Sequence, residues 1–134
     1  MTENYDISDK NIDVNEVWEQ INILNISKQA VFIVLLGIIL NIQFINWNIL
    51  KQMDILNKTS LSEQVGDLSE IPKCSNRMYL FATIVFVLVI YSNYIKTLST
   101  NNQTEIINVK GNLIAALLIL TGTYINFLIL NNNQ

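Results

Sequence analysis

The chain of 134 residues contains no histidine, one cysteine, one proline and four glycines. Without histidine, and with Cys74 as the single thiol, it cannot supply an ordinary zinc site, a Cys–His pair or a Ser–His–Asp triad. The glycines stand singly at positions 37, 66, 111 and 122, so no glycine-rich phosphate-binding loop is present. We therefore expect a non-enzymatic protein with no catalytic residue, no metal site and no cofactor.

Charged residues are also scarce. They make up 14% of the chain, whereas soluble domains usually carry about a quarter. The net charge of −3 is small, and no basic patch is present that would bind nucleic acid. The composition therefore argues against an ordinary soluble domain and against a nucleic-acid-binding protein.

Three long apolar runs, free of charged residues and histidine, account for much of the 51% hydrophobic content. They are Ala30 to Leu50, Met78 to Ile95 and Leu113 to Leu130. A helix needs roughly 20 such residues, within a range of about 17 to 25, to cross a bilayer. The pattern predicts an all-α integral membrane protein built as a bundle of three transmembrane helices.

These runs divide the chain into six segments. We expect an acidic N-terminal tail over 1–27, with a disordered first dozen residues and an amphipathic helix over about 14–26. Transmembrane helices are expected over 28–50, 78–96 and 110–131, joined by loops over 51–77 and 97–109. The first loop should contain a short amphipathic helix that starts at a Ser60–Glu63 capping box and ends before Pro72.

The amphipathic segment near the N-terminus has two interpretations. Its apolar residues recur at helical spacing, and Asp13 with Glu16 resembles a capping box at the helix start. One interpretation is a helix that lies at the membrane interface, with Trp18 as its anchor. The acidic polar face favours docking onto a protein partner instead, because membrane-surface helices normally use Lys and Arg. The sequence leaves both open.

Small and amide side chains line one face of each predicted span. Small residues allow helices in lipid to approach closely, and amides form hydrogen bonds between them. We predict that these faces are helix-packing seams. The seam residues are Ala30, Gly37, Asn41, Asn48, Ala82, Asn93, Ala115, Ala116, Gly122, Thr123 and Asn126.

The amides of the first span have more than one interpretation. On a helical wheel, Gln43 and Asn46 fall on the side opposite the seam. This position fits a helix whose last turns leave the hydrocarbon near a second interfacial anchor, Trp47. Asn41, Asn48 and Asn126 either pack helices together or line a polar pathway. The three apolar runs carry no charge of the kind that marks ion pathways, which favours packing.

The distribution of Lys and Arg gives a weak signal for orientation. The first loop holds Lys51, Lys58, Lys73 and Arg77, and the opposite side also holds four cations. The helices that flank the first loop favour that loop inside. We expect an integral protein of the bacterial cytoplasmic membrane with its N-terminus outside.

The seams and the acidic tail are the only patterned features, so the leading hypothesis is an accessory or scaffold subunit that acts through helix–helix association. Its partners would be the lipid bilayer and either another membrane protein or its own copies. The alternatives are a small oligomeric pore or an immunity-type protein that binds another membrane protein. The three-span layout resembles holin-like pore formers and small bacteriocin-immunity proteins, a likeness of layout alone.

Overall fold

The computed structural model describes residues 13–100 and 102–132, so the acidic first dozen residues of the predicted tail lie outside it. The described chain forms four helices in the order α1 (Val14–Asn57), α2 (Leu61–Val65), α3 (Ile71–Leu98) and α4 (Gln103–Asn132). Three of them, α1, α3 and α4, are long and apolar enough to cross a membrane. The predictions of an all-helical fold and of three helices of membrane-spanning length are confirmed.

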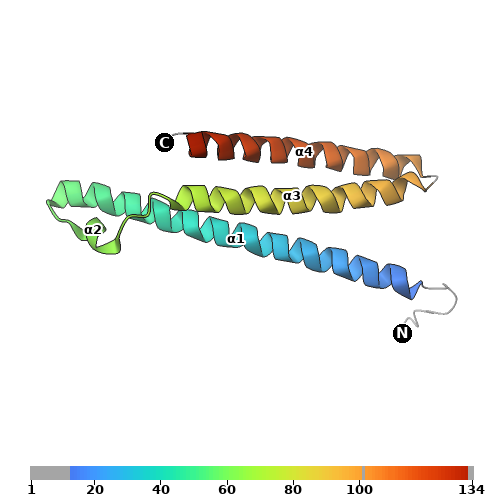
Figure 1. The fold of residues 1–134 in the computed structure, drawn as a ribbon, viewed down its shortest axis with the longest axis horizontal. Helices are drawn as coiled ribbons and strands as arrows, with labels where there is room; N and C mark the ends of the chain where they lie inside the picture. Colours follow the sequence, from blue (N-terminus) through green and yellow to red (C-terminus); the bar gives the residue numbers. More distant parts are fainter. Residues whose placement is uncertain (1–12, 101, 133–134) are drawn as a thin grey trace, which may run out of the picture.

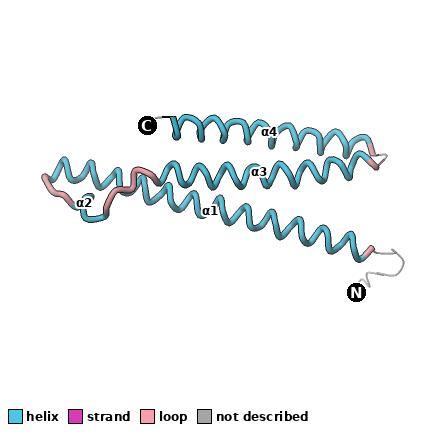
Figure 2. The backbone as a smooth tube through the Cα atoms, in the orientation of Figure 1, coloured by secondary structure: helices cyan, strands magenta, loops and turns pink. Residues whose placement is uncertain are grey.

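The three long helices lie side by side with α3 in the middle (Figures 1 and 2). Successive helices run in opposite directions, and α1 and α4 each pack on α3 but not on each other within the described residues. Toward its N-terminus α1 diverges from α3. At the opposite end α1 extends past the ends of α3 and α4, and α2 lies beside this extension. The bundle is therefore open along the N-terminal half of α1.

The start of α1 lies where the sequence places it. The side chain of Asp13 accepts a hydrogen bond from the backbone N–H of Asn15 at 2.9 Å, which satisfies one of the unpaired donors of the first turn. The helix then continues for 44 residues. The predicted amphipathic helix and the predicted first span are thus one helix, because no proline or glycine interrupts residues 14–36.

The carboxylate of Asp54 organises the end of α1. It accepts hydrogen bonds from the Thr59 hydroxyl and from the backbone N–H groups of Leu61 and Ser62, the latter two at 3.0 and 2.7 Å. Ser60 makes no side-chain capping bond, so the predicted Ser60–Glu63 capping box is wrong. Asp54 caps α2 instead, because its two carboxylate oxygens accept from the backbone N–H groups of Leu61 and Ser62 in the first turn of α2.

The first loop is shorter than the sequence analysis predicts. Helix α1 continues to Asn57, and α3 begins at Ile71 rather than near Met78. Pro72 lies in the first turn of α3, where its fixed φ suits a helix and its missing N–H has no intrahelical partner to lose. Gly66 ends α2 with a φ of 90°, a backbone conformation that favours glycine.

The apolar side chains of the long helices face outward. The only apolar residues that are buried within the described chain are Ala30, Trp47, Ala82 and Ala116. Large side chains such as Phe32, Leu88 and Leu118 expose 57%, 61% and 68% of their surface. Small residues therefore fill the helix contacts, and the bulky residues lie on the outside, as expected where the surroundings are lipid.

The Asp54 cap makes a testable contribution to the α1–α2 connection. Hydrogen bonds from the Ser62 and Thr59 side chains and from nearby backbone N–H groups hold the pKa of Asp54 well below its usual value. Because the folded pKa is depressed, the stabilisation is fully present above the unfolded carboxyl pKa of about 3.9 and is lost as pH falls toward the folded value.

We expect Asp54→Asn to accelerate hydrogen exchange several-fold at the backbone amides of Leu61 and Ser62 at pH 7. The substitution replaces one of the two accepting carboxylate oxygens with an NH2 group, which can only donate. Asp67→Asn is the matched control, because Asp67 is exposed and bonds only to nearby Ser69. Equal exchange rates in the Asp54 variant and the wild type would contradict the assignment.

Candidate functional site

A polar cluster joins α1 to α3. The side-chain N–H of Asn41 donates to the hydroxyl of Tyr79 at 3.1 Å, and the hydroxyl of Ser75 donates to the Asn41 carbonyl oxygen at 2.7 Å. Ser75 is fully buried, with 1% of its surface exposed. Because two groups on α3 hold one amide of α1, the cluster fixes the position of α1 along the axis of α3.

Glycine at position 37 allows the close approach on which this cluster depends. A Cβ atom placed on Gly37 would lie 2.7 Å from Cε1 of Tyr79, well inside normal contact distance. Ala30 on α1 and Ala82 on α3 expose only 1% and 0% of their surface. The predicted seam residues Ala30, Gly37, Asn41 and Ala82 therefore all lie at the contact between α1 and α3.

The sequence analysis missed Ser75 and Tyr79 as partners of Asn41. Together with Ala82 they stand at spacings of four and three, the same helical stripe that marks the seam of α1. The predicted second span begins at residue 78, so Ser75 lay in the predicted loop and the stripe was cut. If the predicted span is extended by one helical turn toward Pro72, a helical-wheel projection shows the whole stripe.

The remaining predicted residues of α1 have other surroundings. Asn48 donates to the carbonyl of Phe44 in its own helix at 3.1 Å, so it does not join the cluster. Trp47 is buried, its ring lies 3.9 Å from the Lys51 ammonium, and its Nε1 has no partner among the described residues. Trp18 is exposed, with 60% of its surface accessible. Of the two predicted anchors, only Trp18 presents its ring to the surroundings.

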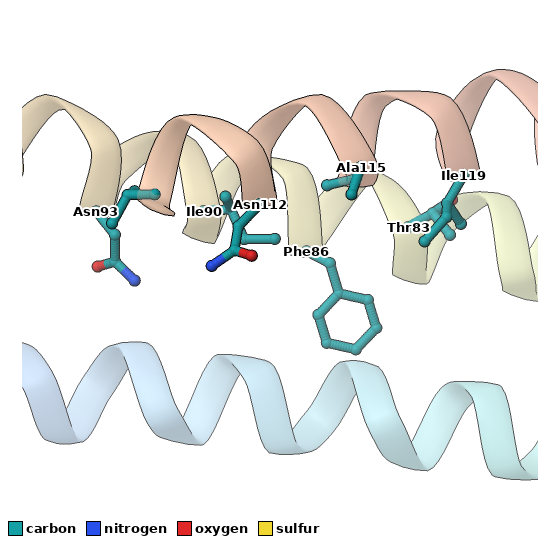
Figure 3. Close-up of a pocket in the computed structure, with 9 residues that line it drawn as sticks. Thr83, Phe86, Ile90, Asn93, Asn112, Ala115 and Ile119 are labelled. Carbon is teal, nitrogen blue, oxygen red and sulfur yellow. The ribbon is translucent and has the colours of Figure 1, made fainter. Parts of the chain in front are cut away.

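A hollow of about 420 Å³ lies between α3 and α4, on the side that faces the diverging half of α1 (Figure 3). We call it the α3–α4 groove. The side chains of Asn93, Asn112 and Phe86 point from it toward α1. Its lining consists of Thr83, Phe86, Ile90, Asn93, Val109, Asn112, Ala115, Ala116 and Ile119. The predicted seam residues Asn93, Ala115 and Ala116 therefore lie together here.

The last three predicted residues lie further along α4. Asn126 lines a hollow of about 350 Å³ that also includes Asn41, Ser75 and Tyr79, so it lies near the polar cluster. The hydroxyl of Thr123 donates to the carbonyl of Ile119 in its own helix at 2.9 Å. A Cβ atom on Gly122 would meet nothing within 4 Å. This glycine therefore faces open space rather than another described helix.

Charged side chains mark two ends of an apolar band on α3. At one end the Lys96 ammonium pairs with the Glu19 carboxylate at 2.7 Å, and at the other Arg77 donates to the Asn131 side chain at 3.4 Å. At 1.5 Å per residue, Arg77 and Lys96 are roughly 28 Å apart along the helix. This length matches the hydrocarbon thickness of a bilayer, about 30 Å.

Helix α1 is offset relative to this band. Glu19 lies level with Lys96 and Asn41 lies level with Ser75, so the part of α1 beside the band runs between residues 19 and 41. The apolar stretch of α1 itself runs from residue 30 to 50. Consequently Asn46 and Asn48 lie on the extension of α1 past the start of α3 (Figure 1). Their amides are not at the centre of the band.

A polar hollow of about 790 Å³ lies at the Lys96 end and is lined by residues from the start of α1, the end of α3 and the start of α4. Glu16, Glu19 and Glu105 line it together with Lys96. In the described part of the chain, no group of three His, Cys, Asp or Glu side chains is placed to hold a metal ion.

Comparison with protein-family models, with curated proteins and with solved structures finds no match to this chain.

The Gly37 contact predicts a difference between two glycines. Gly37→Leu should lower the stability of the purified chain in detergent by about 1–3 kcal/mol, because the new side chain overlaps the Tyr79 ring and breaks its hydrogen bond with Asn41. Gly122→Leu, the matched control, should cause no loss, since its surroundings are open. Unfolding by a denaturing detergent measures both. Equal losses at the two positions would contradict the packing.

Proposed function

We propose that this chain is a multi-pass membrane protein with three transmembrane helices that acts, without enzymatic activity, as an accessory or scaffold subunit. Its outward-facing apolar surface supports insertion, since each Å² of apolar surface left in water forgoes about 25 cal/mol of stabilisation. The three long helices are each of sufficient length and apolarity. Lipid is the surrounding that this surface suits.

The α3–α4 groove is the observation that carries the proposed association. Its small residue Ala115 and its amides Asn93 and Asn112 are the side-chain types that join helices within lipid. Helix α1 diverges from α3 toward its N-terminus (Figure 1), and the groove faces this half of α1 (Figure 3). The groove therefore suits a helix of another membrane protein or of a second copy.

A pore lined by Asn41 and Asn48 is the weaker proposal. The Asn41 amide is engaged by Ser75 and Tyr79, and Asn48 bonds to its own helix. Both residues lie toward the α2 end of the helix bundle rather than along the band between Arg77 and Lys96. These bonds leave Asn41 few groups to offer to passing ions or water.

The distribution of cations supports an orientation. Lys51, Lys58, Lys73 and Arg77 lie toward the α2 end, where Lys73 pairs with Glu70, and Lys96 and Lys110 lie toward the other end, where Lys96 pairs with Glu19. Cytoplasmic loops carry an excess of Lys and Arg. We propose that the α2 end and the C-terminus face the cytoplasm of a bacterial cell and that the N-terminus lies outside.

Filling the groove tests the proposed association. Ala115→Phe should release the bound membrane protein, or the second copy, because the ring occupies space that the incoming helix needs. Ile114→Phe is the matched control, since Ile114 is exposed and does not line the groove. The tagged chain is purified from its native membrane in mild detergent, and the mass and stoichiometry of the complex are measured.

We expect a defined complex for the wild type and for Ile114→Phe, and the isolated chain for Ala115→Phe with its helical content unchanged. A complex of the same mass and stoichiometry in both variants would refute the groove as the docking site. A wild-type chain that purifies alone would refute the scaffold function itself.

A further inference from the structure

One cation lies within the apolar band. Lys28 is on α1 between Glu19, which is level with Lys96, and Asn41, which is level with Ser75. At 1.5 Å per residue, it is about 13 Å from the level of Lys96 and roughly 16 Å from the level of Arg77. Its four-carbon stem is shorter than either distance. Lys28 is therefore near mid-depth if the band spans the bilayer, as the proposed function requires.

Lys28 points away from the rest of the bundle. Ala30, Gly37 and Asn41 define the side of α1 that packs on α3, and Lys28 falls on the opposite side of the helix at 100° per residue. It is exposed and forms no ion pair with any residue in 13–100 or 102–132. A charged side chain at this depth is expensive and is normally paired.

The described part of a second copy offers no carboxylate at the depth of Lys28. The apolar stretches of α1, α3 and α4 contain no Asp or Glu, and Glu19 already pairs with Lys96. Two parallel copies would place Lys28 against Lys28. Because Lys28 lies near the middle of the band, an inverted copy would also bring the two cations to nearly the same depth. No carboxylate in residues 13–100 or 102–132 of either copy therefore lies at this depth, and a different protein can supply one.

The surroundings of Lys28 on the outward face of α1 suit a helix. At 100° per residue Asn25 offers an amide one turn from Lys28, and the exposed apolar side chains of Ile21, Leu24 and Phe32 lie on the same face. Amide side chains form hydrogen bonds between adjoining helices in lipid. A lipid phosphate would need to descend well below the headgroup layer to reach the Lys28 ammonium.

We propose that the outward face of α1 around Lys28 binds a transmembrane helix of another protein that carries an Asp or Glu at mid-depth. This inference rests on the proposed function and names the chemistry of its partner. It assigns the partner to the face of α1 opposite α3, which is separate from the α3–α4 groove.

The test uses the full chain in phosphatidylcholine vesicles. A donor fluorophore on the exposed thiol of Cys74 reports energy transfer to an acceptor on a synthetic polyleucine transmembrane helix. The helix carries a single Asp, Asn or Lys at its centre. Wild type, Lys28→Leu and Lys28→Glu are compared, and Lys110→Leu serves as the matched control because Lys110 lies outside the apolar stretch of α4.

We expect the wild type and Lys110→Leu to bind the Asp helix at least about tenfold more tightly than the Asn helix. Lys28→Leu should lose this preference, and Lys28→Glu should prefer the Lys helix. Equal binding of the Asp and Asn helices by the wild type, as expected if lipid phosphate neutralises Lys28, would overturn the proposal. So would a preference that survives in Lys28→Leu. Either failure leaves the groove experiment intact, because that experiment concerns the other face of the bundle.

Discussion

The hydrogen bonds between Asn41 and its two partners on α3 set the geometry on which the other features depend. Ser75 and Tyr79 hold both ends of one amide, and Gly37 permits the Tyr79 ring to lie against α1. An amide engaged at both ends tolerates little sliding, since a shift of one turn would leave buried polar groups unpaired. The ion pair between Lys96 and Glu19 holds α1 at the same position along α3 near the other end of α3.

This register explains the mixed character of α1. Its amide-bearing end, around Asn46 and Asn48, extends beyond α3 and meets α2, whose first turn is capped by Asp54. Its N-terminal half lies beside the apolar band although it carries Lys28. The same divergence of α1 that exposes this half opens the α3–α4 groove (Figures 1 and 3). Both surfaces that we propose to bind helices therefore follow from one contact.

Much of the fold could be predicted from the sequence, because each of the three charge-free apolar runs corresponds to one long helix. The spacing of Ala30, Gly37 and Asn41 also identified the side of α1 that packs on α3. The offset between α1 and α3 could not be predicted, because hydropathy along one helix contains no information about its neighbour. It depends on Ser75, which precedes the apolar run of α3.

Other differences have the same origin. The capping of α2 by Asp54 joins residues seven and eight positions apart across a turn, and local motif rules do not reach that far. The burial of Trp47 depends on the segment around Val65 and Leu68 that follows α1 and lines the same hollow. Gly122 has the spacing of a packing residue, yet it faces open space because α3 is the one described helix that packs on α4. Wheel positions show which residues share a face but not what covers it.

The depth of α1 in a bilayer tests this account most directly. Nitroxide labels are placed one at a time at the exposed positions Phe32, Ile39, Ile49 and Leu88 in a Cys74→Ser background, and their accessibility to oxygen and to a water-soluble nickel reagent is measured in vesicles. We predict that residue 32 is as deep as residue 88 and that residue 49 is exposed to water. A maximum depth at residue 39, with residues 32 and 49 equally shallow, would contradict it.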